Sequence, residues 1–306
     1  MMVGMQHKAP DFMEGLQGQL LVNEPMSRHT SWRVGGKAEY FYTPADKADL
    51  IKLLTQLPPT MPLYWMGLGS NLLVRDGGVD GMILRTAKGL SKIQHVEPDV
   101  IIAQAGVSSA KIARISSQCG LTGVEFLAGV PGSFGGALAM NAGAFGGETW
   151  PWVQEVECVD RQGNLSTLQA EEIDYGYRSA DIPLAHWITE GRLKLKIAPE
   201  NWQGKEKIRS LLDKRSASQP IQSANAGSVF QNPEGNFAAR LIEQAGWKGE
   251  KIGGAEVSTT HANFIINQGD ANAADIIELI ERIQHDVFDS FNVQLKTEVR
   301  VIGRSE

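Results

Sequence analysis

An α+β fold is predicted for this chain, with a two-lobed body over residues 33–198 and a smaller α+β domain over residues 199–306. In the two lobes, about residues 33–90 and 91–198, apolar runs of strand length alternate with helix-like segments. A glycine-rich segment, residues 123–147, interrupts the second lobe. Beyond it, capped amphipathic helices replace the alternation. A length of 306 residues is also typical of about two domains.

Residues 1–32 are expected to form a lead-in, of which residues 1–22 are poorly ordered. This stretch contains Asp11 and Glu14 and has no apolar core, so it does not resemble a signal peptide. No apolar run approaches the roughly 20 residues of a membrane helix. These features predict a cytoplasmic protein that does not contact a membrane.

The first lobe is expected to contain one helix and two strands. Thr43 and Pro44 indicate the helix start, because threonine is a common cap and proline suits the first helical position. An apolar strand over residues 63–66 then leads into the loop 67–71. A second short strand is expected over residues 82–84, after a turn-rich stretch.

The second lobe continues with a strand over residues 100–103. Ser108 can cap the next helix, and Gly120 is placed to end it. After the glycine-rich segment, residues 153–159 alternate between apolar and polar types and lead to a turn over residues 160–163, which predicts a hairpin.

The last domain is expected to contain two capped helices and a strand. Asn236 would cap the first helix, and Asn272 a longer one in which Asp275 favours the positive end of the helix dipole. The longer helix has an apolar stripe of Ile276, Ile280, Ile283, Val287 and Phe291. Residues 293–301 alternate strictly, which predicts a final strand.

Composition and charge exclude several classes of function. The 29 basic and 35 acidic residues give a net charge of −6, which argues against nucleic-acid binding but leaves room for a local basic pocket. Cys119 and Cys158 cannot form a disulfide framework and are expected to be reduced and buried. The six histidines have no metal-ligand spacing, so no metal site is expected.

Two glycine segments are candidates for ligand binding. Glycines in the loop 67–71 let backbone amides approach an anion closely, although a simple tight turn explains this loop equally well. The segment 123–147 is a stronger candidate, since its glycines would weaken a helix or strand. The alternative is a flexible surface loop, but Val130, Phe134 and Met140 make it too apolar for that. A large bound cofactor is the favoured interpretation.

Six motifs in this sequence occur in the order found in one known family. They are Gly67-Leu-Gly-Ser-Asn71, Val124-Glu-Phe-Leu-Ala-Gly-Val-Pro-Gly-Ser-Phe-Gly-Gly136, Asn141-Ala-Gly-Ala-Phe-Gly146, Tyr175-Gly-Tyr-Arg178, Asn225-Ala-Gly-Ser-Val-Phe-Gln-Asn-Pro233 and Leu295-Lys-Thr-Glu-Val-Arg-Val-Ile-Gly303. Together they cover about residues 23–303, and the chain resembles the UDP-N-acetylenolpyruvoylglucosamine reductases, in the shorter form of that family.

This resemblance implies a two-lobed FAD-binding domain of the vanillyl-alcohol-oxidase (PCMH) type, followed by a substrate domain. It implies non-covalent FAD as carrier and NADPH as electron donor. The reaction implied is reduction of UDP-N-acetylglucosamine enolpyruvate to UDP-N-acetylmuramate, a step of peptidoglycan precursor synthesis. The expected partners are therefore small molecules, with no obligate protein partner.

The resemblance also assigns roles to three residues. Ser228 matches the family's proton donor, Arg178 the arginine that stabilises the enol intermediate, and Glu298 the catalytic glutamate. Reduction of an enolpyruvyl ether needs such groups, because a proton must be supplied and negative charge develops on the carboxylate. Without the family, Ser228 is a turn serine, Arg178 a surface ion-pair residue, and Glu298 part of an exposed charged strand face.

Further residues are assigned to the cofactor and the substrate. The expected cofactor contacts are Gly67, Leu68, Gly69, Ser70, Asn71, Gly129, Val130, Pro131, Gly132, Ser133, Gly135, Gly136, Asn141, Ala142, Gly143 and Arg300. The expected substrate contacts are Tyr177, Arg215, Asn232, His261 and Asn263, with a structural role equally favoured for His261. The chain departs from the family where Ser179-Ala180-Asp181 follows Arg178, and where Ser218 stands in place of a lysine of the longer form.

Two other functions are compatible with parts of this pattern. One is a different flavin oxidoreductase of the same fold that oxidises an alcohol or lactone. That class often attaches its flavin through a histidine near the glycine segment, and none lies between His95 and His186. The other is a catalytically silent module that binds a sugar nucleotide. It would be expected to lack one of the three catalytic residues, and all three are present.

Overall fold

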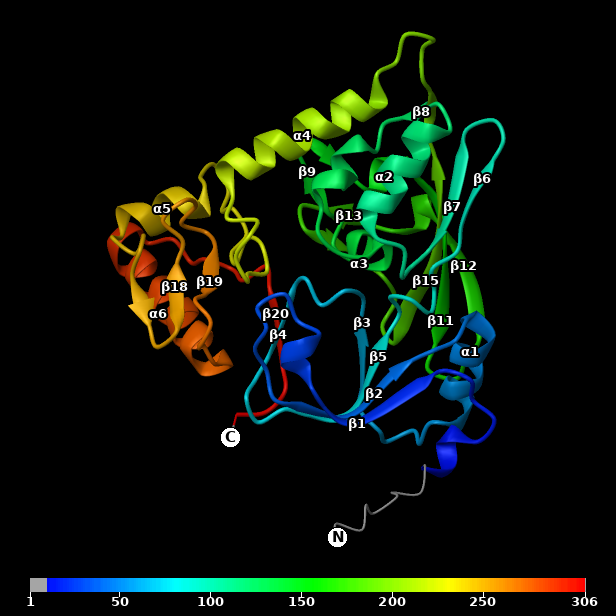
Figure 1. The fold of residues 1–306 in the computed structure, drawn as a ribbon, viewed down its shortest axis with the longest axis horizontal. Helices are drawn as coiled ribbons and strands as arrows, with labels where there is room; N and C mark the ends of the chain where they lie inside the picture. The colour runs from blue at the N-terminus through cyan, green and yellow to red at the C-terminus, as the bar shows by residue number, and fades with distance from the viewer. Residues whose placement is uncertain (1–9, 306) are drawn as a thin grey trace.

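The computed structural model describes residues 10–305, and its first lobe is a four-stranded sheet covered by one helix (Figure 1). The strands lie in the order β1 (Gln19–Pro25), β2 (Lys37–Thr43), β5 (Val79–Arg85) and β3 (Leu63–Met66). β1 is antiparallel to β2, whereas β2, β5 and β3 are parallel to one another. The expected strands over residues 63–66 and 82–84 are therefore confirmed.

Helix α1 (Lys47–Gln56) begins later than the sequence predicted. β2 continues to Thr43, so Thr43 and Pro44 lie before the helix, and the expected start there is wrong. The cap is Asp46, whose side chain accepts a hydrogen bond from the amide of Asp49 at 2.9 Å. Pairing with β1 extends β2, which a local cap signal does not reveal.

The prediction that residues 1–22 are poorly ordered is wrong for the later part of this segment. A short 3-10 helix spans Asp11–Met13, and residues 19–22 belong to β1, where they pair with β2. Residues 1–9 lie outside the described part of the chain. Trp32 is fully buried, and its indole N–H donates to the carbonyl of Ile265 at 2.7 Å. The segment before residue 33 is thus part of the folded structure.

The second lobe is a five-stranded antiparallel sheet. Its strands lie in the order β12 (Leu165–Gln169), β11 (Val153–Asp160), β15 (His186–Lys194), β7 (Val100–Gln104) and β6 (Ile93–Val96). Helix α2 (Ser109–Gln118) begins after Ser108, whose hydroxyl accepts from the amide of Lys111, as predicted. The expected hairpin is also confirmed as β11 and β12.

The glycine-rich segment folds into short elements beside this sheet. They are a 3-10 helix over Glu125–Gly129, helix α3 (Phe134–Ala139), and the paired strands β9 (Gly143–Ala144) and β10 (Gly147–Glu148). The next hairpin is β13 (Tyr175–Gly176) with β14 (Ser179–Ala180). A further pair, β8 (Leu121–Thr122) and β16 (Lys196–Ile197), completes the lobe.

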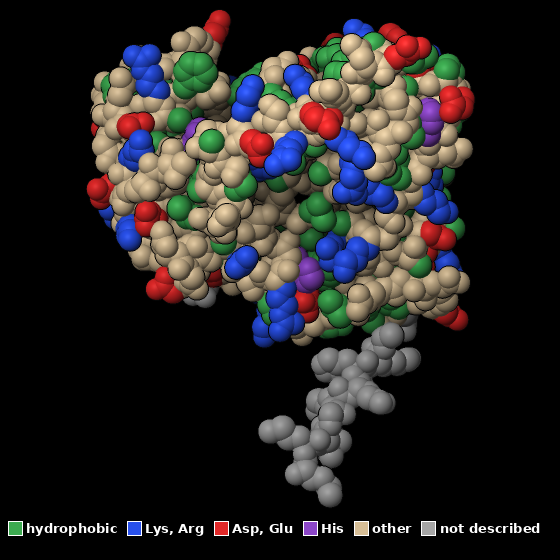
Figure 2. Space-filling model, turned by 45° about the horizontal axis from the view of Figure 1, so that its top comes forward, with side chains coloured by type: hydrophobic (Ala, Val, Ile, Leu, Met, Phe, Trp, Pro, Cys, Tyr) green, Lys and Arg blue, Asp and Glu red, His purple; other side chains and the backbone are tan. Residues whose placement is uncertain are grey.

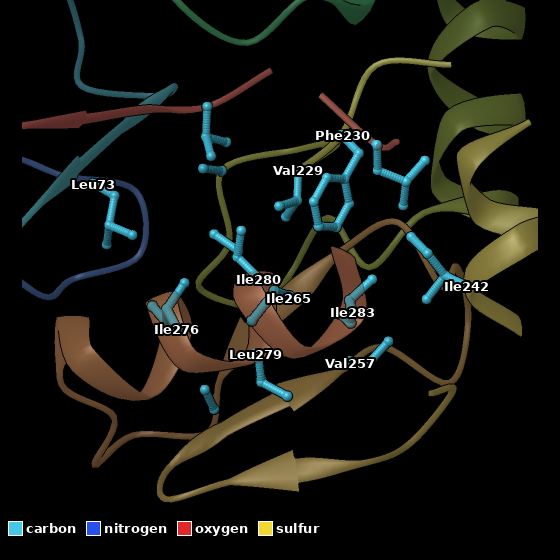
Figure 3. Close-up of a cluster of buried hydrophobic side chains, with 14 of the residues drawn as sticks. Leu73, Val229, Phe230, Ile242, Val257, Ile265, Ile276, Leu279, Ile280 and Ile283 are labelled. Carbon is cyan, nitrogen blue, oxygen red and sulfur yellow. The ribbon is translucent and has the colours of Figure 1, made fainter. Parts of the chain in front are cut away.

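Helix α4 (Gly204–Ser218) leads from the second lobe to the C-terminal domain (Figure 1). That domain contains α5 (Ala238–Gln244), the sheet β17 (Lys251–Ile252), β18 (Ala255–Val257) and β19 (Ile265–Asn267), and α6 (Ala273–Phe291). Figure 3 shows Ile276, Leu279, Ile280 and Ile283 of α6 among its buried side chains. Asn272 caps α6 as predicted, with Asp275 completing a reciprocal capping box.

Two sequence expectations for this domain are wrong. α5 begins after Phe237, and its first amide donates to the side chain of Asn232 rather than to that of Asn236. The alternating segment 293–301 is not one long strand. Only β20 (Arg300–Ile302) forms there, and it pairs in parallel with β4 (Leu72–Val74) of the first lobe.

The C-terminal domain is joined to the first lobe by more than this strand pair. Trp32, Val34 and Leu73 belong to the hydrophobic core of the C-terminal domain. The carboxylate of Asp76 accepts hydrogen bonds from the first two amides of α6, at 3.0 and 2.9 Å. A boundary at residue 198 therefore does not separate two independent cores. Within residues 10–305, no helix is long and apolar enough to cross a membrane.

Candidate active site

A cavity of about 880 Å³ lies where the two lobes and the C-terminal domain meet. Figure 2 shows the surface hollowed near the centre of this view, with Lys and Arg side chains close to the hollow. Of the residues expected to bind the cofactor, all except Asn141 line this cavity. Arg178, Ser228 and Glu298 line it as well, so three distant segments of the sequence meet there.

The loop 67–71 leaves β3 and offers free backbone amides to the cavity. Among residues 10–305, none of the N–H groups of this loop donates a hydrogen bond to another group. Unpaired backbone amides that line a cavity favour an anion, because they supply donors without side-chain entropy. The loop therefore fits a phosphate or diphosphate.

The two glycine segments interlock, and this explains several of their glycines. The hydroxyl of Ser70 donates to the carbonyl of Pro131 at 3.1 Å. A Cβ added at Gly67 would lie 2.0 Å from Oγ of Ser133, and one added at Gly132 would lie 2.8 Å from Oγ of Ser70. These glycines are required by contact between the loops themselves, which differs from the expectation that a ligand alone requires them.

Gly136 is different from these glycines. It lies in α3 and lines the cavity, and a Cβ added there would meet only Oγ of Ser133, at 3.7 Å. Gly135, the preceding residue, would instead place its Cβ 2.7 Å from that of Ala105. Of the two glycines in this helix, Gly136 is therefore the one whose Cβ position is open to the cavity.

The cavity is locally basic although the chain as a whole is acidic. Its lining contains Arg178, Arg215 and Arg300 but only one carboxylate, that of Glu298. The walls are otherwise mostly glycine backbone and apolar side chains. In such surroundings a positive charge attracts an anionic ligand more strongly than it would in water. The cavity therefore suits anionic ligands.

Arg178 and Glu298 form an ion pair across the cavity wall. Nε of Arg178 lies 2.9 Å from Oε1 of Glu298, and both side chains are mostly buried. Nη1 of Arg178 also donates to the carbonyl of Gly143 at 3.3 Å. Arg178 has a φ of +58°, because it occupies the tight turn of the β13–β14 hairpin. This turn directs the guanidinium toward the C-terminal domain.

Burial raises the pKa of Glu298 above its ordinary value, and the neighbouring Arg178 opposes this shift. Water stabilises a carboxylate strongly, so its removal favours the protonated form. The result is a carboxyl group that keeps its proton to a higher pH than a free glutamate does. This property suits a residue that takes part in proton transfer.

The segment that carries Ser228 is hydrogen-bonded through its backbone to the segment that carries Glu298. The amide of Glu298 donates to the carbonyl of Val229 at 2.7 Å. Gly227 has a φ of +78° and places the serine at the cavity. On the other side, the side-chain amide of Asn71 donates to the carbonyl of Glu298 at 3.0 Å, and the amide of Arg300 donates to the carbonyl of Asn71.

Two asparagines expected to contact ligands have structural partners instead. Asn263 is buried, and its side chain forms two hydrogen bonds with the backbone of Phe230, at 2.9 and 2.8 Å. Asn141 is also buried and donates to the carbonyl of Gly176 at 3.0 Å. Neither lines the cavity. In this structure the side chain of Asn263 therefore supports the Ser228 segment and that of Asn141 supports the Arg178 hairpin, and their direct contact with a ligand remains a prediction.

The other expected substrate residues differ in position. Arg215 lines the cavity from α4, its Nε donates to Gln219 at 3.0 Å, and burial lowers its pKa. Tyr177 and Asn232 do not line the cavity. The amide of Asn232 donates to the Tyr177 hydroxyl at 3.3 Å, which links the second lobe to the C-terminal domain. His261 also lies off the cavity, with its pKa lowered by burial.

Sequence reasoning missed one wall of the cavity. Trp65 of β3 and Trp187 of β15 stack with ring centroids 5.1 Å apart and ring planes 2° apart. Residues 182–188 line the cavity beside them, and Leu184 in this stretch is 95 % exposed. No local motif marks these residues, since their meeting depends on how the two sheets pack. The only available signal was an aromatic residue in each of two apolar strands.

Two models of known protein families match this chain, one in its N-terminal part and one in its C-terminal part. The family model described as UDP-N-acetylenolpyruvoylglucosamine reductase, C-terminal domain, matches residues 219–302. The model described as FAD binding domain matches residues 38–169. The second model covers most of the two lobes, so the expected FAD-binding fold is confirmed.

Curated relatives carry the same name. The UDP-N-acetylenolpyruvoylglucosamine reductase of Methylococcus capsulatus is 49 % identical over 291 residues, which cover 95 % of each chain. That of Thiobacillus denitrificans is 48 % identical, over 95 % of this chain and 94 % of its own. Among solved structures, the reductase from Thermus caldophilus matches with a TM-score of 0.79 and 31 % identity, over 94 % of this chain and 99 % of its own.

Proposed function

This chain belongs to the UDP-N-acetylenolpyruvoylglucosamine reductase family, and on that basis we propose that NADPH is its electron donor and that Arg178, Glu298 and Ser228 handle the charge and the proton of the reaction. The chain is an FAD-dependent oxidoreductase that reduces the enolpyruvyl ether of a UDP-sugar. When bound, FAD would supply the hydride chemistry that connects NADPH to the terminal methylene carbon of the substrate.

The cavity walls fit both the cofactor and the substrate. The free amides of the loop 67–71 would hold the FAD diphosphate, with the interlocked residues 129–133 completing the wall. Arg215 is the candidate for the substrate diphosphate, because its terminal guanidinium nitrogens have no carboxylate partner among the described residues. Arg300 adds positive charge next to Asn71.

Arg178 would bind the carboxylate of the enolpyruvyl group. Hydride addition at the methylene carbon leaves an electron pair on the neighbouring carbon, and this charge delocalises onto the carboxylate as an enolate. A guanidinium held by Glu298 and by the carbonyl of Gly143 is already oriented for this charge. A preoriented donor of this kind stabilises the transition state more than the ground state.

Ser228 would deliver the proton that completes the reaction. The proton moves from its hydroxyl to the carbon that carries the ether oxygen, and the electron pair of the enolate forms the new C–H bond. The product is then the lactyl ether of UDP-N-acetylmuramate. Glu298, with its pKa raised by burial, would support this transfer or hold the enol form.

The meeting of Arg178, Ser228 and Glu298 on one cavity, next to a loop with free amides, carries this proposal. The test uses the purified protein and follows the visible absorbance of the flavin under anaerobic conditions. NADPH should bleach the flavin, and the enolpyruvyl UDP-sugar should restore its colour. A protein that cannot be loaded with FAD, or whose reduced flavin this substrate does not reoxidise, would contradict it.

A further inference from the structure

Among residues 10–305, Ser228 forms no hydrogen bond that would hold it at the cavity. Its position is therefore set by the residues on either side of it in the sequence. A reacting group that is displaced by about 1 Å can cost an enzyme roughly 100-fold in rate. The contacts that fix the neighbours of Ser228 therefore matter for the reaction.

The residues that follow Ser228 lie between two partners. On one side, the amide of Glu298 donates to the carbonyl of Val229 at 2.7 Å. On the other side of Phe230, the partner is a side chain. The amide of Phe230 donates to Oδ1 of Asn263 at 2.9 Å, and its carbonyl accepts from Nδ2 of Asn263 at 2.8 Å.

The Asn263 side chain takes the place of a neighbouring strand. A primary amide presents an acceptor and a donor in one plane, so it can satisfy both backbone groups of Phe230. Asn263 is buried, and its own carbonyl accepts from the amide of Val229 at 2.9 Å. Figure 3 shows Val229 and Phe230 among the buried side chains of the C-terminal domain. Without the Asn263 amide, a buried N–H and C=O would be unpaired, and the segment would have to shift to satisfy them.

The residue before Ser228 is held by a local contact. The amide of Gly227 donates to Oδ1 of Asn225 at 2.9 Å, within the same turn. A Cβ added at Gly227 would meet no atom within 4 Å, so packing does not restrain the turn on that side. The contact that ties this segment to a distant part of the domain is that of Asn263, which is 33 positions from Phe230 in the sequence.

We propose that Asn263 is a positioning residue for the proton donor, because its side-chain amide fixes Phe230 and thereby holds the Ser228 hydroxyl against one face of the enolate. This inference rests on the proposed function, since it requires Ser228 to deliver the proton. In that step the O–H bond of Ser228 breaks, the enolate electron pair forms the new C–H bond, and the serine oxygen regains a proton from water.

The product records where the proton came from. The carbon that accepts it carries four different groups in the lactyl ether, so its configuration shows which face of the enolate was protonated. A displaced Ser228 hydroxyl would transfer its proton more slowly and would leave both faces open to water. Loss of the Asn263 amide is therefore expected to change both the rate and the configuration of the product.

The test uses Asn263→Leu in the FAD-loaded protein, because leucine has the shape of asparagine without its donor and acceptor. Stopped-flow absorbance follows the two half-reactions separately. Flavin bleaching by NADPH should be unchanged, whereas reoxidation by saturating enolpyruvyl UDP-sugar should slow by roughly 10- to 100-fold. The dissociation constant of the substrate should not change. Chromatography of the product should show a second epimer at the lactyl carbon, where the unaltered protein gives one.

Asn267 provides a matched control in the same sheet. Its Nδ2 donates to the carbonyl of Trp32 at 2.9 Å, and its Oδ1 accepts from the amide of Gly269 at 2.7 Å. It does not line the cavity. Asn267→Leu should therefore lower stability without slowing reoxidation or producing the second epimer. Equal effects of the two substitutions would show that general loosening of the domain is responsible, and the positioning role would be wrong.

Asn263→Asp keeps the test decisive if the leucine variant does not fold. When protonated, the introduced carboxyl offers both an acceptor and a donor to Phe230, whereas the ionised form has no donor for its carbonyl. Reoxidation relative to the unaltered protein should therefore become faster as pH falls. His261, whose Nδ1 accepts from the amide of Asn263 at 3.3 Å, titrates in both proteins, as do Lys296 and Glu298 on the segment beyond Phe230. Their titration is thus common to both rates. A ratio that is constant, or that increases with pH, would contradict the inference.

The outcomes separate this inference from the proposed function. Reoxidation at the full rate with a single epimer in Asn263→Leu would overturn the positioning role, even if Ser228→Ala is slow. A weaker substrate affinity with unchanged reoxidation at saturation would show that Asn263 binds the substrate directly instead. Reoxidation at the full rate in Ser228→Ala would overturn the proposed function itself, whatever the behaviour of the Asn263 variants.

Discussion

Nε of Arg178 lies 2.9 Å from Oε1 of Glu298, and this ion pair joins the second lobe to the C-terminal domain at the cavity. The two residues are 120 positions apart in the sequence, and each has a further backbone contact that fixes its place. Arg178 donates to Gly143, and the backbone of Glu298 contacts Val229 and Asn71. Removal of either charge should therefore alter both the proposed substrate site and the contact between domains.

Arg178→Lys should slow the reduction of the substrate by about 10²–10³-fold, because one lysine ammonium cannot reproduce the two-pronged guanidinium contact with a carboxylate. Flavin reduction by NADPH should continue. The two half-reactions can be followed separately by stopped-flow absorbance. Arginine and lysine are equally strained at a φ of +58°, so this substitution changes the guanidinium without changing the backbone strain. Unchanged reoxidation by the substrate would contradict the assigned role.

Ser228→Ala should leave flavin bleaching by NADPH intact and slow reoxidation by the substrate by about 10²–10⁴-fold, the usual contribution of general acid catalysis. Ser223→Ala is a suitable control, since Ser223 is exposed on the same segment and does not line the cavity. If Ser228→Ala loses both half-reactions, the serine has a structural role instead.

Glu298 should make the stability of the protein depend on pH. Because burial raises its pKa in the folded state, its contribution is fully present below the pKa of the unfolded chain and is lost as pH rises through the folded value. The unfolding free energy of the unaltered protein should therefore fall relative to Glu298→Gln over this window, by at most about 1.4 kcal/mol per pH unit. Urea denaturation at a series of pH values measures it. A difference that is constant with pH, or that grows as pH rises, would show that the shift has the wrong sign.

Gly136→Ala should separate folding from cofactor binding. Alanine is favoured over glycine inside a helix by about 0.5–1 kcal/mol, and the added Cβ meets no protein atom closer than 3.7 Å, so the FAD-free protein should be slightly more stable. FAD affinity should fall, because the methyl group enters the cavity. Thermal unfolding and FAD titration measure the two effects.

The neighbouring substitution provides the contrast. Gly135→Ala should destabilise the FAD-free protein, because its Cβ would lie 2.7 Å from that of Ala105. If Gly136→Ala binds FAD with undiminished affinity, the cofactor does not lie against α3.

Trp32→Phe should destabilise the folded chain by about 1–3 kcal/mol, because the indole hydrogen bond to the carbonyl of Ile265 is lost in a buried site. Trp202→Phe is the matched control. The indole nitrogen of Trp202 has no hydrogen-bond partner among the described residues, so this change removes none. Equal denaturation midpoints for the two variants would contradict the anchoring role of Trp32.

Local signals in the sequence predicted those elements whose ends are set by their own residues. The Ser108 and Asn272 caps, and the turn of the β11–β12 hairpin, are examples, since each is completed within a few residues. The predictions of secondary structure were wrong where pairing with a strand distant in the sequence decides which residues form a strand. β1 forms because β2 lies beside it, and the segment 293–301 is interrupted as a strand because it must reach both Phe230 and β4.

The site could be predicted only in part for the same reason. The glycine loops have a local composition that indicates ligand binding, but Ser228, Arg178 and Glu298 look ordinary in their own segments. Their selection depended on resemblance to a family, and their proximity depends on the packing of three separate elements. Asn141 and Asn263 were expected to contact ligands, and their side chains form hydrogen bonds with the backbone near the cavity. A sequence motif does not distinguish a side chain that supports the backbone of a site from one that binds the ligand.

The pairing of β20 with β4 has a consequence for how the protein is made. Residues 72–74 leave the ribosome more than two hundred residues before their partner strand, so the loop that precedes them has to wait for its final hydrogen bonds until translation has passed residue 300. FAD added to a nascent chain should therefore be retained only after that point. We therefore expect tight cofactor binding only once both strands have been synthesised.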